Sequence, residues 1–163
     1  MKEWCDRSEL NPHDSLIAIN YLKDLNTWPE WSSSCTRMLV DCDSGLGVGL
    51  KICMHRMVKG ALIEEHWECT NLREEEKHYV VDLEWIAQHR MGKPSAQGIK
   101  QWKLNITILA EAGGGIEVHS EWDVSSKGRL FKRSYRKMIV QFSRVLLNDL
   151  MYAVVSRTVD QEE

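Results

Sequence analysis

A change of hydrophobic period divides this sequence into two parts. From about residue 35 to residue 124, apolar and polar side chains alternate in six short runs separated by turn-like gaps. From Gly128 to about Arg157, apolar residues follow at helical spacing without interruption. Strict alternation predicts half-buried antiparallel strands, and short gaps between the runs predict hairpins. The chain should therefore form a meandering sheet followed by one long helix.

The segment before the sheet has its own start signals. Residues 2–10 fit a short first strand. Asn11 can cap a helix that has Pro12 at its first position and ends near residues 24–26. Thr27 can cap a second, short helix that runs to about Ser33. Residues 88–98 form the longest expected loop, and long loops in small domains often carry function.

Length and composition favour one globular domain. The 163 residues, 43% hydrophobic and 28% charged, fit a single domain over residues 1–163, with a frayed tail at about 159–163. The net charge of −3 argues against general nucleic-acid binding. Five cysteines, no CxxC pair and no apolar run at the N-terminus indicate reduced thiols in the cytoplasm. We expect no cofactor, and the oligomeric state is left open.

Three segments carry a resemblance to a known superfamily. They are LKDLNTWPEW at residues 22–31, DSGLGVGLKI at 43–52 and GGGIEVHSEWDV at 113–124. With the order strand, two helices, six strands and long helix, the chain resembles the START-like (helix-grip) superfamily, of the polyketide cyclase/dehydrase and lipid-transport type. The resemblance implies an α+β fold in which a curved antiparallel sheet of about six to seven strands wraps around the C-terminal helix. It also implies a cavity between sheet and helix, and it implies no particular reaction.

Large apolar side chains should line that cavity. Four tryptophans lie on the apolar faces of four different strands, and aromatic residues and a methionine face them from the helix. Such a lining suits a flat or greasy ligand, although the same residues could instead fill a core that has no cavity. The expected ligand-binding residues are Trp31, Met54, Trp67, Trp85, Trp102, Ser120, Trp122, Tyr135, Met138 and Phe142.

Glu65 is the polar exception on an apolar strand face. By alternation it points inward with Ile63 and Trp67. An inward carboxylate needs a partner, so Glu65 is either a ligand-orienting or acid/base group, or a residue that a bulge returns to water. Glu65 and Tyr135 are the catalytic candidates, and neither belongs to a recognisable catalytic set. Ser120 could donate to a ligand carbonyl or to the protein itself.

Two other sites are less well supported by the sequence. Cys53 and His55 share a strand face, but two ligands do not make a metal site, so we expect no metal. The glycines at positions 45, 47 and 49 are followed by a strand and not by a helix, which excludes the phosphate-binding interpretation.

Three functions remain open. The first is binding of a hydrophobic small molecule, such as a lipid, quinone, aromatic or polyketide-like compound. The second is a cyclase or dehydratase reaction on a polyketide-like substrate in the same cavity. The third is protein interaction through the outer, basic face of the helix at residues 129–137, a face that also suits transient contact with a membrane surface.

Overall fold

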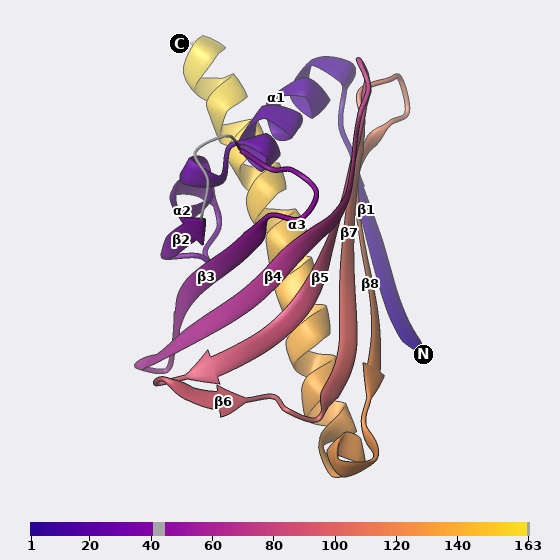
Figure 1. Ribbon diagram of the computed structural model, residues 1–163. Helices are drawn as coiled ribbons and strands as arrows, with labels where there is room; N and C mark the ends of the chain where they lie inside the picture. The colour runs from indigo at the N-terminus through magenta and orange to yellow at the C-terminus, as the bar shows by residue number, and fades with distance from the viewer. Residues whose placement is uncertain (41–44, 163) are drawn as a thin grey trace.

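An antiparallel sheet and a long C-terminal helix make up the chain (Figure 1). The structure is a computed structural model that describes residues 1–40 and 45–162. Its strands are β1 (Lys2–Glu9), β2 (Arg37–Val40), β3 (Lys51–Val58), β4 (Ala61–Glu74), β5 (His78–Arg90), β6 (Lys93–Ser95), β7 (Ile99–Leu109) and β8 (Gly115–Val124). Its helices are α1 (Pro12–Lys23), η1 (Leu25–Thr27), α2 (Trp28–Trp31), η2 (Ser126–Phe131) and α3 (Lys132–Glu162).

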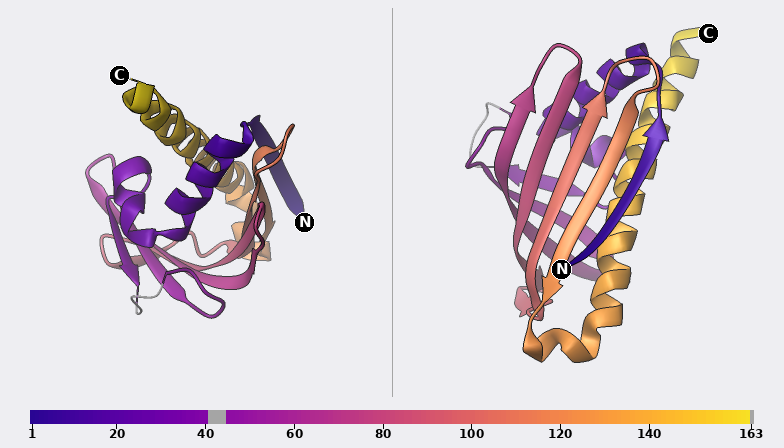
Figure 2. Two further views of the ribbon diagram at one scale, coloured as in Figure 1. Left: turned by 90° about the horizontal axis from the view of Figure 1, so that it is seen from above. Right: turned by 90° about the vertical axis from the view of Figure 1, so that its right-hand side faces the viewer.

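The sheet has the strand order β1-β8-β7-β5-β4-β3-β2, and β6 pairs with β5. All of these pairings are antiparallel. Seen from above, the sheet curves around one side of α1 and α3 (Figure 2). This is the expected helix-grip architecture: a curved sheet, short helices after the first strand and a long helix at the end. The first strand and the capping by Asn11, whose Oδ1 accepts from the Asp14 amide, are also as expected.

Helix α3 presents its apolar face to the sheet. The continuous helical segment Ser126–Arg157, which joins η2 to most of α3, is long and apolar enough to cross a membrane by length and composition alone. One face of α3 is instead buried against the sheet, so α3 is the core helix of the fold. The buried residues on this face are Ile139, Phe142, Leu146, Leu147, Leu150 and Val154.

Both ends of α3 differ from the expectation. The helical pattern was expected from Gly128 onward, but Ser126–Phe131 forms the 3-10 helix η2, and Phe131 at its end is 57% exposed. At the other end the backbone stays helical to Glu162, although the sequence suggested a frayed tail from about residue 159. Neither glycine nor proline occurs after Gly128, so no strong helix breaker stops the helix.

A β-bulge changes the orientation of side chains near the end of β5. Trp67 of β4 pairs with Trp85, but the preceding His66 pairs with Ala87, which leaves Ile86 as the extra residue. An extra residue reverses the alternation beyond it. Gln88 therefore faces the core, and Ile86 is about half exposed. The loop expected at residues 88–98 is correspondingly shorter, because β5 continues to Arg90 and β6 follows.

Candidate functional site

An open hollow lies between the sheet and the first turns of α3. It has a volume of about 380 Å³, and it lies on the side of α3 that faces β3, β4 and β5. It is lined by Ser34, Arg56, Val58, Ile63, Gln88, Arg90, Ser134, Lys137, Met138, Gln141, Phe142 and Val145. Polar, cationic and apolar side chains therefore meet at one opening of the interface between sheet and helix.

Glu65 is the centre of a polar network beneath this hollow. Its side chain is completely buried. Oε1 accepts from Arg56 Nη2 at 2.9 Å and from Gln88 Nε2 at 2.6 Å. Oε2 accepts from Trp85 Nε1 at 2.8 Å. A buried charge is tolerated when it is paired and hydrogen-bonded, and these three donors meet that requirement.

The partners of Glu65 are themselves held in place. Ser95 Oγ on β6 donates to Gln88 Oε1 at 2.9 Å, and Gln88 Nε2 lies 3.7 Å from Met138 Sδ. The Arg56 guanidinium lies over the Phe142 ring, with Cζ 5.8 Å from the ring centroid. Helix and sheet thus fix the network from both sides.

Arg56 keeps donor capacity that the network does not use. Its side chain is 16% exposed, it lines the hollow, and its Nε has no hydrogen-bond partner among the described residues. A guanidinium carries five N–H donors, and the single bond to Glu65 uses one of them. Arg56 can therefore donate to an acceptor group on a molecule that enters the hollow.

The tryptophans that were expected to line a cavity pack closely against one another and the helix. Trp67, Trp102 and Trp122 are fully buried. The Trp67 and Trp102 ring centroids are 4.6 Å apart, and Phe142 lies 5.7 Å from the first and 5.3 Å from the second. Trp85 lies 6.4 Å from Trp102. These rings occupy the centre of the interface between sheet and helix, and the hollow lies beside them.

Ser120 takes part in a short hydrogen-bond chain inside the core. It accepts from Trp102 Nε1 at 3.2 Å, and its Oγ lies 2.8 Å from Ser143 Oγ on α3. Ser143 donates in turn to the Ile139 carbonyl. Both serines are fully buried, so the chain ties β7, β8 and α3 together.

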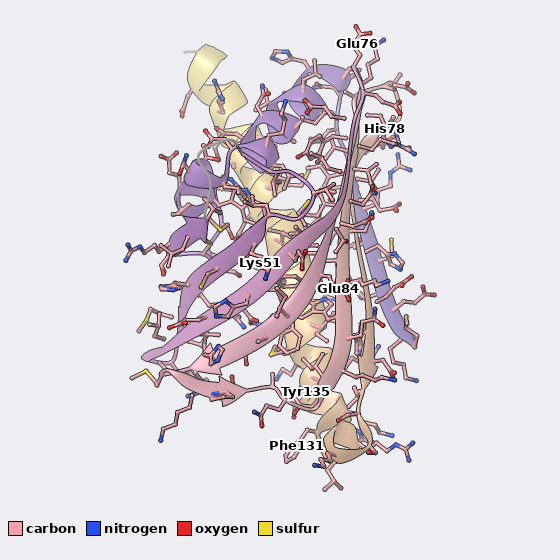
Figure 3. All side chains as sticks on the ribbon, in the orientation of Figure 1. Lys51, Glu76, His78, Glu84, Phe131 and Tyr135 are labelled. Atoms are coloured by element: carbon pink, nitrogen blue, oxygen red, sulfur yellow. The ribbon has the colours of Figure 1, made fainter. Side chains whose placement is uncertain are left out.

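The remaining expected site residues are dispersed. Trp31 and Met54 are buried, and Trp31 lies 5.0 Å from Trp28, between ring centroids. Tyr135 packs near Phe131 at the start of α3, with ring centroids 6.3 Å apart, as Figure 3 shows. The groups that bond Glu65 come from Arg56, Trp85 and Gln88, and not from Tyr135. The two catalytic candidates, Glu65 and Tyr135, therefore do not share a hydrogen-bond network.

Sequence reasoning missed three residues of the network: Arg56, Gln88 and Ser95. A signal existed for Arg56, because it continues the inward alternation of Ile52 and Met54 by one more step. The sequence contained no such signal for Gln88, because simple alternation from Trp85 places Ala87 inward and Gln88 outward. Ser95 was expected in a loop.

Two groups of potential metal ligands occur among the described residues, both on the outer face of the sheet. One contains Cys53, Glu64 and His66. The other contains Glu3, His119 and Glu121, in which Glu3 is largely exposed. Neither group is near the Glu65 network, because the side chains of a strand alternate between the two faces.

No protein-family model matches this chain, and no curated protein sequence matches it. Solved structures do. Ara h 8.0201 has a TM-score of 0.71 at 15% identity, covering 95% of this chain and 97% of its own. The aromatase/cyclase Zhui from Streptomyces sp. R1128 has a TM-score of 0.66 at 10% identity, with 96% and 94% covered. Norcoclaurine synthase from Thalictrum flavum has a TM-score of 0.64 at 11% identity, with 94% and 85% covered.

These similarities show the fold. The chain has the helix-grip fold of START-like and Bet v1-like proteins over nearly its whole length. At such low identity, a shared fold does not transfer a ligand or a reaction.

Proposed function

We propose that this protein binds a hydrophobic small molecule whose apolar body enters between sheet and helix and carries one polar acceptor group, such as a carbonyl or a carboxylate. The observation that supports this most directly is the Arg56–Glu65–Gln88 network beside the hollow. Glu65 holds Arg56 in position, and Arg56 has unused donors and lines a hollow to which Met138 and Phe142 also contribute. A few fixed polar groups in a mainly apolar site are typical of small-molecule sites.

Binding is better supported than catalysis. A general base must reach its substrate, and Glu65 is completely buried and already accepts from three protein donors. We assign Glu65 the role of positioning Arg56. A cyclase or dehydratase reaction remains the alternative, and turnover that is lost in Glu65→Gln while the ligand still binds would favour it.

The binding experiment compares two fluorescent probes, anilinonaphthalene sulfonate and its neutral analogue phenylnaphthylamine. Removing Arg56 alone would leave Glu65 buried without its cation, so the variant is the double substitution Arg56→Met with Glu65→Gln. Hydrogen bonds to charged groups contribute about 1.5–3 kcal/mol, so the sulfonate should bind about 10–100-fold more weakly. The neutral probe should bind nearly as before.

The matched control is Arg73→Met, because Arg73 is an exposed arginine on β4 that pairs with Glu75. It should leave both affinities unchanged. If the double variant binds the sulfonate as well as the wild type does, Arg56 does not meet the ligand. Native mass spectrometry of the purified protein would then identify any bound molecule directly.

A second candidate function rests on the surface at the start of α3. Leu130 is 90% exposed and Phe131 57% exposed. Exposed basic residues surround this apolar pair: Lys127, Arg129, Lys132, Arg133, Arg136 and Lys137. We call Leu130, Phe131 and these six residues the basic tip. Figure 1 shows η2 at the same end of the molecule as β6, and Lys137 also lines the hollow.

The basic tip is firmly attached to the sheet. Gly98 and Gly128 are in such close contact that a Cβ on Gly128 would lie 2.5 Å from the Gly98 carbonyl oxygen. An exposed apolar pair among exposed cationic residues suits an anionic lipid surface, where each nearby Lys or Arg contributes about 1 kcal/mol. We propose that the tip docks transiently on anionic membranes, in a protein that otherwise resides in a reducing, cytoplasmic setting.

Vesicle co-sedimentation tests the docking. The protein should sediment with vesicles that contain phosphatidylserine, less so at high salt, and not with vesicles of phosphatidylcholine alone. Leu130→Ser with Phe131→Ser should abolish binding, while Tyr152→Ser, which removes an exposed aromatic residue from the other end of α3, should not. Equal sedimentation with both vesicle types, or with neither, would contradict docking on anionic lipid, and basic-tip-dependent capture of a protein would favour the interaction function instead.

A further inference from the structure

Side chains of metal-binding type gather on the outer face of the sheet. Cys53 and His55 on β3, Glu64 and His66 on β4, and His89 on β5 are all partly buried. Strand pairing places Cys53 opposite His66, and Glu64 opposite both His55 and His89. Three of the six histidines in the chain thus belong to this group, one from each of three neighbouring strands. Together with Cys53 and Glu64 they line an open hollow of about 1000 Å³.

Three of these side chains are close enough to share one ion. Cys53 Sγ lies 4.0 Å from His66 Nε2, and His66 Nε2 lies 3.7 Å from Glu64 Oε2. All three donor atoms are within 4.8 Å of one another. Metal–ligand bonds of about 2.0–2.3 Å in a tetrahedron place neighbouring donors about 3.3–3.6 Å apart. Small side-chain shifts would therefore bring the three atoms into coordination.

We propose that Cys53, Glu64 and His66 bind a divalent ion of the zinc class on the outer face of the sheet, and that His89 supplies the fourth ligand. The donor set selects this class. A thiolate with an imidazole and a carboxylate suits Zn²⁺ or Co²⁺, whereas Mg²⁺ and Ca²⁺ prefer oxygen ligands throughout.

The environment of His89 supports its part in the site. Its ring meets the His66 ring edge to face, with centroids 5.2 Å apart. Its Nδ1 is buried and has no hydrogen-bond partner among the described residues. A buried nitrogen without a partner is unfavourable, and a bound ion beside it would remove that penalty after a rotation of the side chain.

The other group of donors lacks these features. Glu3, His119 and Glu121 contain no thiol, and Glu3 is 73% exposed. His119 Nε2 already lies 3.2 Å from Glu3 Oε2 and 4.0 Å from Glu121 Oε1, so direct contacts with these two carboxylates account for the arrangement. We therefore assign the site to Cys53, Glu64 and His66.

Cobalt titration of the chelator-treated full-length protein tests the site. Co²⁺ should produce the intense visible absorption of a tetrahedral complex together with a thiolate-to-cobalt charge-transfer band, at one ion per chain. Zn²⁺ should displace it and raise Tm, because an ion that binds only the folded state stabilises that state.

Variants locate the ion. Cys53→Ser should remove the charge-transfer band, and His66→Ala should weaken Zn²⁺ binding by at least about tenfold, since even outer-shell partners contribute that much. Cys5→Ser is the matched control, because Cys5 is a free, exposed cysteine opposite His119 on the strand pair that carries the other group. The proposal is overturned if no charge-transfer band forms, or if Cys5→Ser removes it and Cys53→Ser does not.

The outcome is independent of the small-molecule proposal. The ion site and the ligand hollow are on opposite faces of the sheet, so Cys53→Ser should leave the affinity for both fluorescent probes unchanged. A metal-free result would thus overturn the ion site alone.

Discussion

Glu64 and Glu65 are neighbours in sequence and have opposite environments. Glu65 points to the inner face of the sheet, is completely buried and accepts hydrogen bonds from Arg56, Gln88 and Trp85. Glu64 points to the outer face, is about one-third exposed and faces His66 at 3.7 Å. Alternation along one strand thus gives Glu65 fixed hydrogen-bond partners in the core and leaves Glu64 accessible to an added ion.

The inner carboxylate should matter much more for stability than the outer one. Glu65→Ala leaves the Arg56 cation in the interface without its partner, and breaking such a buried pair costs about 3–5 kcal/mol. Glu64→Ala should change the free energy of unfolding by less than about 0.5 kcal/mol, as surface substitutions do. Urea unfolding of both variants checks the contrast. Equal losses would mean that the Glu65 network does not contribute as its burial implies.

On the neighbouring strand β5, the inward Gln88 should likewise matter more for stability than the outward His89, with a smaller difference. Gln88→Ala removes a donor to Glu65 and the acceptor for Ser95, so we expect a loss of about 1–3 kcal/mol. His89→Ala on the outer face should be nearly neutral without metal, or slightly stabilising, since it removes a buried nitrogen that has no partner. Denaturant midpoints measured with chelator present test this. A larger loss for His89→Ala would contradict the assignment of faces.

The smallest expected effect is a loss of stability at alkaline pH, which should come mainly from the buried Cys35 thiol. Burial raises the pKa of the Cys35 thiol from 9.0 to about 11, and burial, then the Glu64 charge, raises that of Cys53. As the pH rises above 9, Cys35 loses its proton in the unfolded chain before it does so in the folded protein. The contribution of Cys35 to the free energy of unfolding is therefore complete below pH 9 and is lost as the pH rises toward 11. The unfolding midpoint of the wild type should fall more over this range than that of Cys35→Ala. An equal fall of the unfolding midpoint with pH in both proteins would contradict this role of Cys35.

The fold could be predicted from the sequence because its signals are local. Alternation defined the strands, Asn11 marked a helix start, and the long run after Gly128 indicated the core helix. The same alternation predicted that Glu65 points inward. These features depend on side-chain period and backbone chemistry, which a single sequence contains.

The site could be predicted only in part, because it depends on contacts between distant residues. The bulge at Ile86 brings Gln88 opposite Glu65, and nothing in the residues before it announces the extra residue. The filling of the centre by Trp67 and Trp102 depends on how the helix settles against the sheet. The donors Cys53, Glu64 and His66 occupy outward positions in the alternation of their strands, but their proximity follows from the register of β3 on β4.

The extra residue at Ile86 divides β5 into two halves whose side chains alternate in opposite order. Up to Trp85, odd-numbered positions face the core, and beyond the bulge even-numbered positions do. The half that packs the aromatic centre and the half that borders the hollow can therefore be altered separately. Deleting Ile86 should remove the bulge while leaving Trp85 opposite Trp67 and Gln88 opposite Glu65, so that both halves keep the faces they now present.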